Sequence, residues 1–462
     1  MKVLVNTILL IGLFIICWPV RSQITFMKVH SHMTDAKGLS IFELDNRNFI
    51  MAGYAKGSFA AASPMLMKLD ENGDPIWTRI YDTQGVSKVY EVIELPGQGF
   101  LLTGYITISD VSRILIIKTD QDGQLTDSIS LGNGTGFSVT HAGGDKYAIG
   151  AENKLPGEYY RHFCFIEIDR SLNVLKNKMH LFNDASRCRS IKATSDGGYI
   201  SVGYTGYDSF GTLNMLGLTT KLDESGEVEW YEEDFHTQGY EVEEVEGDGY
   251  YITGTDIFWN ISAFFSKRDF NGNKVWDKSA GFSGYSHSLA ISDDKLTCVG
   301  SASIIGQYWY AMSLGNINGD FQQIYYGLGE DIDVRAYSVS TCSDKGFIAC
   351  GQSNSDVMVI KTTQQGELLS VNELYKDDKR ITVFPNPSSN YISINLGQID
   401  LSHDSKLLLC NARGSVVYET VIDTKDEVIT CDVSNLTNGL YTVLLRSSGI
   451  VIASKKFIKA GN

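Results

Sequence analysis

A short run of β-favouring residues that leads to a glycine recurs through most of this 462-residue chain. One clear copy is Tyr199 to Val202, which follows the turn residues Asp196-Gly197-Gly198 and stops at Gly203. The seven copies lead to Gly53, Gly104, Gly150, Gly203, Gly254, Gly300 and Gly351, at intervals of 51, 46, 53, 51, 46 and 51 residues. Such a period predicts a repeat fold.

A second marker follows each of these glycines, a turn sequence such as KLDENG, which ends at Gly73. The other six turns end at Gly123, Asn173, Gly226, Gly272, Gly319 and Gly366. Four short alternating runs fill each unit, and four antiparallel strands repeated around an axis are typical of β-propeller blades. The sequence therefore predicts an all-β chain with a seven-bladed β-propeller. A long β-sandwich, or two unrelated β domains, would not need a doubly marked period.

Residues 23–33 form one further predicted strand ahead of the first unit. We expect this strand to close the ring by pairing with the last blade near residues 367–375, where it would cover an open edge. The repeated glycines are expected to permit a close backbone approach or a bulge near the axis.

The two ends of the chain differ from the repeats. Residues 1–22 have Lys2, an apolar run and a polar exit at Arg21-Ser22, which predicts a secretory signal peptide. The uninterrupted apolar core is shorter than the ~20 residues that span a bilayer, so no transmembrane segment is expected in the mature chain. We expect a propeller over 23–376, a charged linker over 377–380 and a separate domain over 381–462.

About seven short strands are predicted after residue 380, enough for a small C-terminal β-sandwich. Four motifs follow one another in this tail: VFPNP from Val383, NARG from Asn411, LTNGLY from Leu436 and KKFIK from Lys455. With these motifs in this order, the tail resembles the type A C-terminal sorting domain of the type IX secretion system of Bacteroidetes. The sorting-signal residues that this resemblance implies are Pro385, Asn386, Pro387, Gly414, Gly439, Tyr441, Lys455 and Lys456.

The resemblance implies a route for the protein. The chain would cross the inner membrane by its signal peptide and the outer membrane through the type IX machinery, with the tail as its address. A sortase-like protease would then remove the tail. The cargo, residues 23–376, would be secreted or displayed on the cell surface.

Charge and ligand-type residues exclude several functions. The formal net charge of −16 disfavours nucleic acid and favours an uncharged or weakly cationic ligand. Acidic residues alternate in the run from Glu241 to Gly249 and are expected to share one solvated face. Turns such as Asp70 to Gly73 lack the ligand ladder of a calcium loop, and there is no C-x-x-C. No metal and no cofactor are predicted.

Enzymatic signals are weak. No G-x-S-x-G elbow occurs, so no catalytic residue is predicted. Trp77, Trp230 and Trp276 follow turn glycines, which resembles the tryptophan-docking repeat of pyrroloquinoline-quinone dehydrogenases. That resemblance implies tryptophans packed between blades and, as a distant alternative, a quinoprotein-like enzyme. The similarity to uncharacterised extracellular propeller repeats, with DGGYIVxG and KLDxxGxxxW patterns, is closer.

Aromatic residues gather in the loops between the second and third strands of the predicted blades. We predict a ligand-binding patch there for a glycan or a protein, formed by Tyr159, Tyr160, Tyr207, Trp259, Tyr308 and Trp309. The alternative is that these rings pack against neighbouring blades. The sequence favours a non-catalytic binding module. An extracellular glycosidase-like hydrolase would instead require carboxylates or histidines with shifted pKa values, converging at the mouth of the channel.

Overall fold

The computed structural model describes residues 23–31, 34–56, 61–209, 212–235, 237–257, 261–304, 307–326, 333–368, 380–397, 399, 405–411, 416–423, 427–447 and 450–460. Every regular element in these ranges is a β-strand. No helix there is long and apolar enough to cross a membrane. The predicted signal peptide and nearly all of the predicted linker lie outside the described residues.

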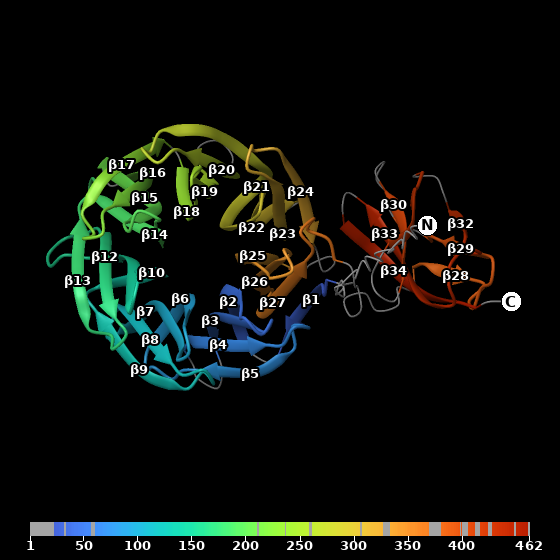
Figure 1. The fold of residues 1–462 in the computed structure, drawn as a ribbon, viewed down its shortest axis with the longest axis horizontal. Coiled ribbons are helices and arrows are strands. Elements are labelled where there is room, and N and C mark those ends of the chain that lie inside the picture. Colours follow the sequence, from blue (N-terminus) through green and yellow to red (C-terminus); the bar gives the residue numbers. More distant parts are fainter. Residues whose placement is uncertain are drawn as a thin grey trace, which may run out of the picture.

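Radial sheets surround a central opening in the first part of the chain (Figure 1). The first four sheets each contain four antiparallel strands, which follow chain order from the axis outward. Their strands are β2 (Thr34–Glu43), β3 (Phe49–Lys56), β4 (Ser63–Leu69) and β5 (Pro75–Ile80); β6 (Val86–Leu95), β7 (Gly99–Ile108), β8 (Val111–Thr119) and β9 (Leu125–Leu131); β10 (Gly134–His141), β11 (Lys146–Asn153), β12 (His162–Asp169) and β13 (Val174–His180); β14 (Ala185–Ala193), β15 (Tyr199–Ser209), β16 (Thr212–Leu222) and β17 (Val228–Phe235).

A seven-stranded sheet continues the ring with β18 (Thr237–Val245), β19 (Gly249–Asp256), β20 (Ser262–Arg268), β21 (Lys274–Ser292), β22 (Lys295–Ile304), β23 (Gln307–Asn316) and β24 (Phe321–Tyr326). The long β21 pairs with β20 in its first part and with β22 from Gly284 onward, so it is the outer strand of one blade and the inner strand of the next. The predicted β-propeller is confirmed. The number seven stays a prediction, and the described strands agree with it when β21 is counted in two blades.

The last sheet of the ring has the order β1-β27-β26-β25. It combines β25 (Val334–Thr341), β26 (Phe347–Ser353) and β27 (Asp356–Thr362) with the N-terminal β1 (Phe26–His30). The N-terminal strand thus completes the last blade, as predicted, but its predicted partner was wrong. Phe26 lies opposite Lys361, because residues 356–362 form the third strand of the blade and leave its outer edge open to β1.

The repeated glycines lie inside the second strand of each unit rather than at its end. Strand β15, for example, continues past Gly203 to Ser209. A Cβ atom on Gly203 would lie 1.9 Å from the carbonyl oxygen of Arg187 on the neighbouring β14. The predicted close backbone approach is therefore confirmed at this position, and the glycine is required because nothing larger fits.

The predicted turns and tryptophans have structural roles. The Asp70 carboxylate accepts hydrogen bonds from the backbone N–H groups of Asn72 and Asp74, which is the expected Asx-type turn. Trp77 packs against the turn glycine Gly123 of the following blade, as a Cβ there would meet its ring at 2.6 Å. The tryptophans at this site join blades, as the repeat pattern implied.

The tail forms two sheets around one core. The three-stranded sheet contains β28 (Thr382–Phe384), β29 (Tyr391–Asn395) and β32 (Val428–Asp432), and the four-stranded sheet contains β31 (Val416–Val421), β30 (Lys406–Asn411), β33 (Gly439–Ser447) and β34 (Ile450–Lys459). Ile392, Leu407 and Val443 from both sheets meet in a single buried cluster. The predicted β-sandwich is confirmed. The seven cysteines of the described residues are buried and form no disulfide.

Candidate functional site

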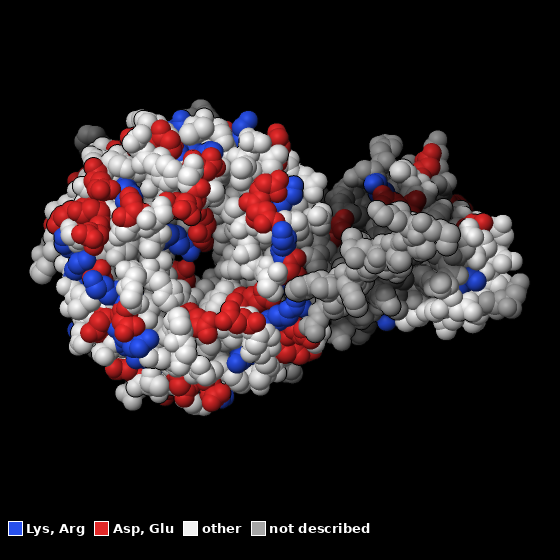
Figure 2. Space-filling view, viewed as in Figure 1, with Lys and Arg blue, Asp and Glu red and all other residues white. Residues whose placement is uncertain are grey.

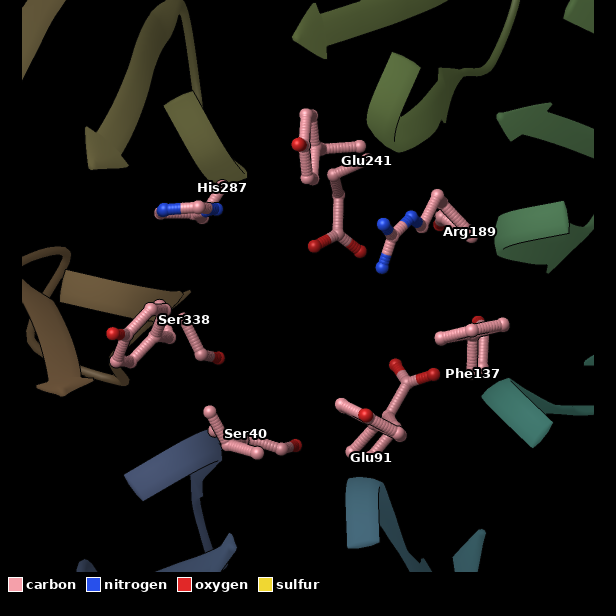
Figure 3. Close-up of a pocket in the computed structure, with 13 residues that line it drawn as sticks. Ser40, Glu91, Phe137, Arg189, Glu241, His287 and Ser338 are labelled. Carbon is pink, nitrogen blue, oxygen red and sulfur yellow. The ribbon is translucent and has the colours of Figure 1, made fainter. Parts of the chain in front are cut away.

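Each innermost strand of the ring carries one β-bulge beside the repeated glycine. The bulge leaves a single residue without a partner on the second strand, and the seven residues are Leu39, Tyr90, Phe137, Arg189, Tyr240, His287 and Tyr337. A bulge re-aims a side chain at the edge of a sheet, and here that edge faces the central channel. Figure 3 shows Phe137, Arg189 and His287 converging on the channel from different blades.

Six of these side chains touch one another around the axis. The contacts between ring centroids or from Arg189 Cζ to a centroid are, in order, Tyr90–Phe137 5.2 Å, Phe137–Arg189 4.9 Å, Arg189–Tyr240 5.4 Å, Tyr240–His287 5.3 Å and His287–Tyr337 5.2 Å. We call this series the π belt. Each such contact contributes roughly 0.5–1.5 kcal/mol, so the belt fixes the side chains in place around the channel.

The π belt encloses a cavity of ≈ 340 Å³, which we call the aromatic chamber. A second cavity of ≈ 370 Å³, the carboxylate chamber, shares Ser40, Glu91, Glu241 and Ser338 with it and adds Lys192 and Glu243. Figure 2 shows the opening of the channel on one face, with acidic side chains spread around it and basic side chains in its wall. Both volumes fall at the lower end of the range of ~300–1,000 Å³ that small-molecule sites occupy.

Arg189 is the one permanently charged member of the π belt. Its guanidinium lies between the rings of Phe137 and Tyr240, and within the described residues it has no hydrogen bond or ion pair. Burial, followed by the charges of Arg189 and Arg335, lowers the pKa of His287 to about 3. His287 is therefore neutral at physiological pH.

The residue after the bulge has a structural task in most blades. Serine or glutamate occupies this position, and at five of the seven positions its side chain accepts a hydrogen bond from a backbone N–H of the next blade. The bonds are Val92 N to Ser40 Oγ 3.3 Å, Val139 N to Glu91 Oε2 2.7 Å, Ile191 N to Ser138 Oγ 3.0 Å, Val339 N to Ser288 Oγ 3.1 Å and Ile41 N to Ser338 Oγ 3.3 Å. These bonds hold adjacent blades together and explain the serines without a ligand.

The carboxylate chamber is built around Lys192. Its Nζ lies 3.6 Å from Glu91, 3.0 Å from Glu241 and 3.2 Å from Glu243. Burial disfavours the ammonium, but the three carboxylates outweigh burial and hold the pKa of Lys192 well above its usual value. Glu241 and Glu243 share one face of β18, as predicted, but this face lies on the channel, where both carboxylates are half-buried and bind Lys192 instead of standing free in solvent.

Replacing Lys192 by methionine should lower the free energy of unfolding by about 3 kcal/mol at neutral pH, since it leaves three close carboxylates without their cation. Burial already raises the pKa of Glu91 and of Glu243, and Lys192 opposes both shifts. A carboxyl whose pKa is higher in the folded chain stabilises that chain as the pH falls. Lys192→Met should therefore regain stability as the pH falls from neutral toward the usual pKa of a glutamate, measured by chemical denaturation.

The control is Lys345→Met, because the ion pair of Lys345 with Asp293 is exposed on both sides. That variant should change stability by less than about 1 kcal/mol at any pH. If both variants lose the same stability with the same pH profile, the three carboxylates do not depend on Lys192.

The predicted loop residues are only partly brought together. Tyr159 is 83% exposed and packs edge-on to Tyr160 at 4.9 Å. The Tyr160 hydroxyl donates to Asp208, next to Tyr207 in the following blade, at 2.6 Å. The ring of Tyr308 is instead covered by Arg335, whose Cζ lies 3.8 Å from the ring centroid. Trp309 is half-buried on β23, and Trp259 lies outside the described residues.

The motifs of the tail meet in space. Asn386 accepts a hydrogen bond from the Ile458 N–H at 2.9 Å and donates one to the carbonyl of Lys456 at 3.2 Å, so the first and last motifs are clamped together. The Tyr441 ring stacks on Phe457 at 5.5 Å. Lys456 is exposed and Lys455 half-buried, Gly439 begins β33, and Gly414 lies outside the described residues.

Comparison with protein families identifies this tail. Residues 382–460 match the family model described as the secretion system C-terminal sorting domain. The match confirms the predicted type IX sorting domain, within one or two residues of the predicted bounds. It also indicates export of the protein and a location on the cell surface or in the medium, as predicted.

Solved structures similar to the chain include other propellers. The extracellular domain of BT4673 from B. thetaiotaomicron has 11% identity and a TM-score of 0.45, and the alignment covers 96% of this chain and 59% of that one. Sqt1 from Chaetomium thermophilum has 11% identity and a TM-score of 0.46, and the alignment covers 81% of this chain and 95% of Sqt1. The Dos1 propeller has 12% identity and a TM-score of 0.44, and the alignment covers 70% of this chain and 77% of Dos1. The chain thus spans about three fifths of the BT4673 domain. No curated protein matches the sequence.

Proposed function

We propose that this chain is a non-catalytic binding module of the type IX secretion system, which carries its ligand site in the aromatic chamber of the propeller channel. The ligand is a glycan or a surface protein. The bulges carry this proposal, because they turn large or charged side chains to the channel, where these side chains line the aromatic chamber. The contacts of the π belt also join adjacent blades, but that role does not require an arginine without a hydrogen bond among the rings.

The route of export follows from the two ends of the chain. A signal peptide over residues 1–22 starts export, the propeller over 23–376 is the cargo, and the linker 377–380 joins it to the sorting domain over 381–462. The secretion machinery reads that domain, and a sortase-like protease removes it. A protein of this kind belongs to a member of the Bacteroidetes.

The aromatic loops form a second candidate surface. Tyr159, Tyr160 and Tyr207 lie near one another through the bond from Tyr160 to Asp208, and their exposure suits a shallow contact with a large partner. Tyr308 and Trp309 lie on β23 and are not part of this group of tyrosines. Compared with these loops, the aromatic chamber offers enclosure and more contacts to a small ligand.

A glycosidase-like hydrolase is the alternative that one observation favours. Glu91 and Glu243 have raised pKa values and face the channel, which is the kind of cluster that an acid–base mechanism requires. Both carboxylates, however, are bound by Lys192, and Glu91 also accepts the Val139 N–H. Release of reducing sugar from any bound glycan, lost in Glu91→Gln, would establish the hydrolase in place of the binding module.

Binding to a glycan and peptide array tests the proposed site. The full chain should bind at least one component, and Tyr240→Ala should weaken that binding by about 2 kcal/mol or more, as truncation of an enclosed aromatic residue does. The matched control is Tyr159→Ala, which removes the same ring from the exposed loop and should leave binding unchanged. A cooperative unfolding transition in each variant, followed by circular dichroism, establishes that both variants are folded. Loss of binding in Tyr159→Ala alone would move the site to the loops.

A further inference from the structure

We infer that the aromatic chamber binds an acidic sugar, with the sugar carboxylate on Arg189 and the sugar hydroxyls toward Glu91 and Glu241. This inference rests on the proposed binding function and names the chemical class of its ligand. It departs from the expectation drawn from net charge, because direct contact between a carboxylate and the unpaired Arg189 guanidinium outweighs repulsion from distant charges of the chain.

The guanidinium of Arg189 is the group that would bind the sugar carboxylate. An arginine inside a protein normally forms charge-assisted hydrogen bonds, and a carboxylate fits its two parallel N–H groups. Here the two flanking rings hold the guanidinium, yet its Nε is buried and has no hydrogen-bond partner, and neither has the Oγ of the adjacent Ser190. A buried polar group without a partner calls for an explanation, and a bound anion would supply one for a guanidinium that lines a cavity.

A lysine beside the π belt is also incompletely neutralised. Lys37 lies 5.7 Å from the ring of Tyr337, and within the described residues it forms no direct ion pair. Burial and then Arg335 and Lys88 lower the pKa of Lys37, while Asp35 and Asp333 act in the opposite direction without cancelling that shift. An added anion would stabilise the charged form of this lysine further.

The chamber also carries groups that suit a sugar better than a simple carboxylate. Figure 3 shows Glu91 and Glu241 directed into the chamber, and carboxylates accept hydrogen bonds from hydroxyl groups. The rings of Tyr90, Tyr240 and Tyr337 supply flat apolar surface on which a sugar ring can stack. An acidic sugar combines an anionic group, several hydroxyl donors and a ring in one molecule.

Matched sugars test the inference. The full chain is titrated calorimetrically with D-glucuronate and D-galacturonate, and with D-glucose and D-galactose, which lack only the carboxylate. At least one acid should bind at least tenfold more tightly than its neutral partner. Arg189→Gln should weaken binding of that acid by about 10- to 100-fold and abolish the preference. Arg189→Lys keeps the positive charge but loses the two parallel N–H groups. Its affinity for the acid should therefore lie between that of the parent chain and that of Arg189→Gln.

The control variant is Arg113→Gln, which makes the same charge change at an exposed position on β8 and should keep the preference. Benzoate and inorganic phosphate are titrated as well, and binding as tight as that of the acidic sugar would assign the site to anions in general. Equal binding of the neutral partner, or an intact preference in Arg189→Gln, would overturn the inference.

The same measurements separate this inference from the proposed function. If neither acidic sugar binds, but an array ligand binds and is lost in Tyr240→Ala, the chamber is a binding site and the assignment to acidic sugars is wrong. If no sugar and no array component binds the folded chain, both the inference and the proposed function are wrong.

Discussion

Deletion of residues 381–462 should leave a folded propeller that remains in the periplasm, with the amount on the cell surface and in the medium reduced to background. The physical reason is that the tail has its own core. Ile392, Leu407 and Val443 pack only with other residues of the tail, whereas the clusters of the ring contain only residues up to 368. Removing the tail therefore removes the address and leaves the cargo intact.

Fractionation of the producing bacterium, combined with protease accessibility on whole cells, measures this outcome. Tyr240→Ala in the full chain is the control, because it alters the channel and keeps the sorting domain, and it should be exported normally. A truncated protein that still reaches the surface would show that the propeller itself carries an export signal.

The second large effect is expected from Gly203→Val. The new side chain would begin 1.9 Å from the carbonyl oxygen of Arg187, so β14 and β15 must separate beside the bulge. Overpacking of this kind costs about 1–3 kcal/mol in a core, and a backbone atom yields less than a side chain, so we expect a loss of about 3 kcal/mol or more. Denaturant unfolding followed by circular dichroism measures the change.

An exposed strand position provides the comparison for that variant. Ser130→Val, on the outer strand β9, adds the same kind of side chain where there is room, and it should change stability by less than about 0.5 kcal/mol. The glycines at the same place in other blades, such as Gly53 and Gly351, meet a backbone oxygen at 1.9 and 1.8 Å and should behave as Gly203 does. Equal stability of Gly203→Val and the parent would mean that the close approach does not require glycine.

The fold could be predicted because its signals are local and repeated. A turn such as Asp70 to Gly73 needs particular residues, and the paired markers repeat this need in every blade. The partner of the N-terminal strand could not be located, because Phe26 and Lys361 are brought together only when the ring closes. Strand register across so long a separation depends on the whole structure.

The candidate site was missed for a related reason. A bulge breaks the alternation by which a strand is recognised, so Tyr90 and Arg189 looked like ordinary strand residues. One signal was present in the sequence: an aromatic, histidine or arginine residue precedes serine or glutamate and then an aliphatic residue, as in Tyr90-Glu91-Val92 and His287-Ser288-Leu289. Alignment of the repeats on this position would have placed six of the seven bulge residues around one axis, and Leu39 would have followed from the spacing.

The position of a bound ligand tests the central claim most directly. A crystal structure of the full chain, grown with the tightest-binding component of the array, should contain the ligand in the channel, in contact with Tyr90, Tyr240 and Arg189. Ligand density on the outer loops beside Tyr159 or Tyr308, with an empty channel, would contradict the account and assign binding to the rim of the propeller.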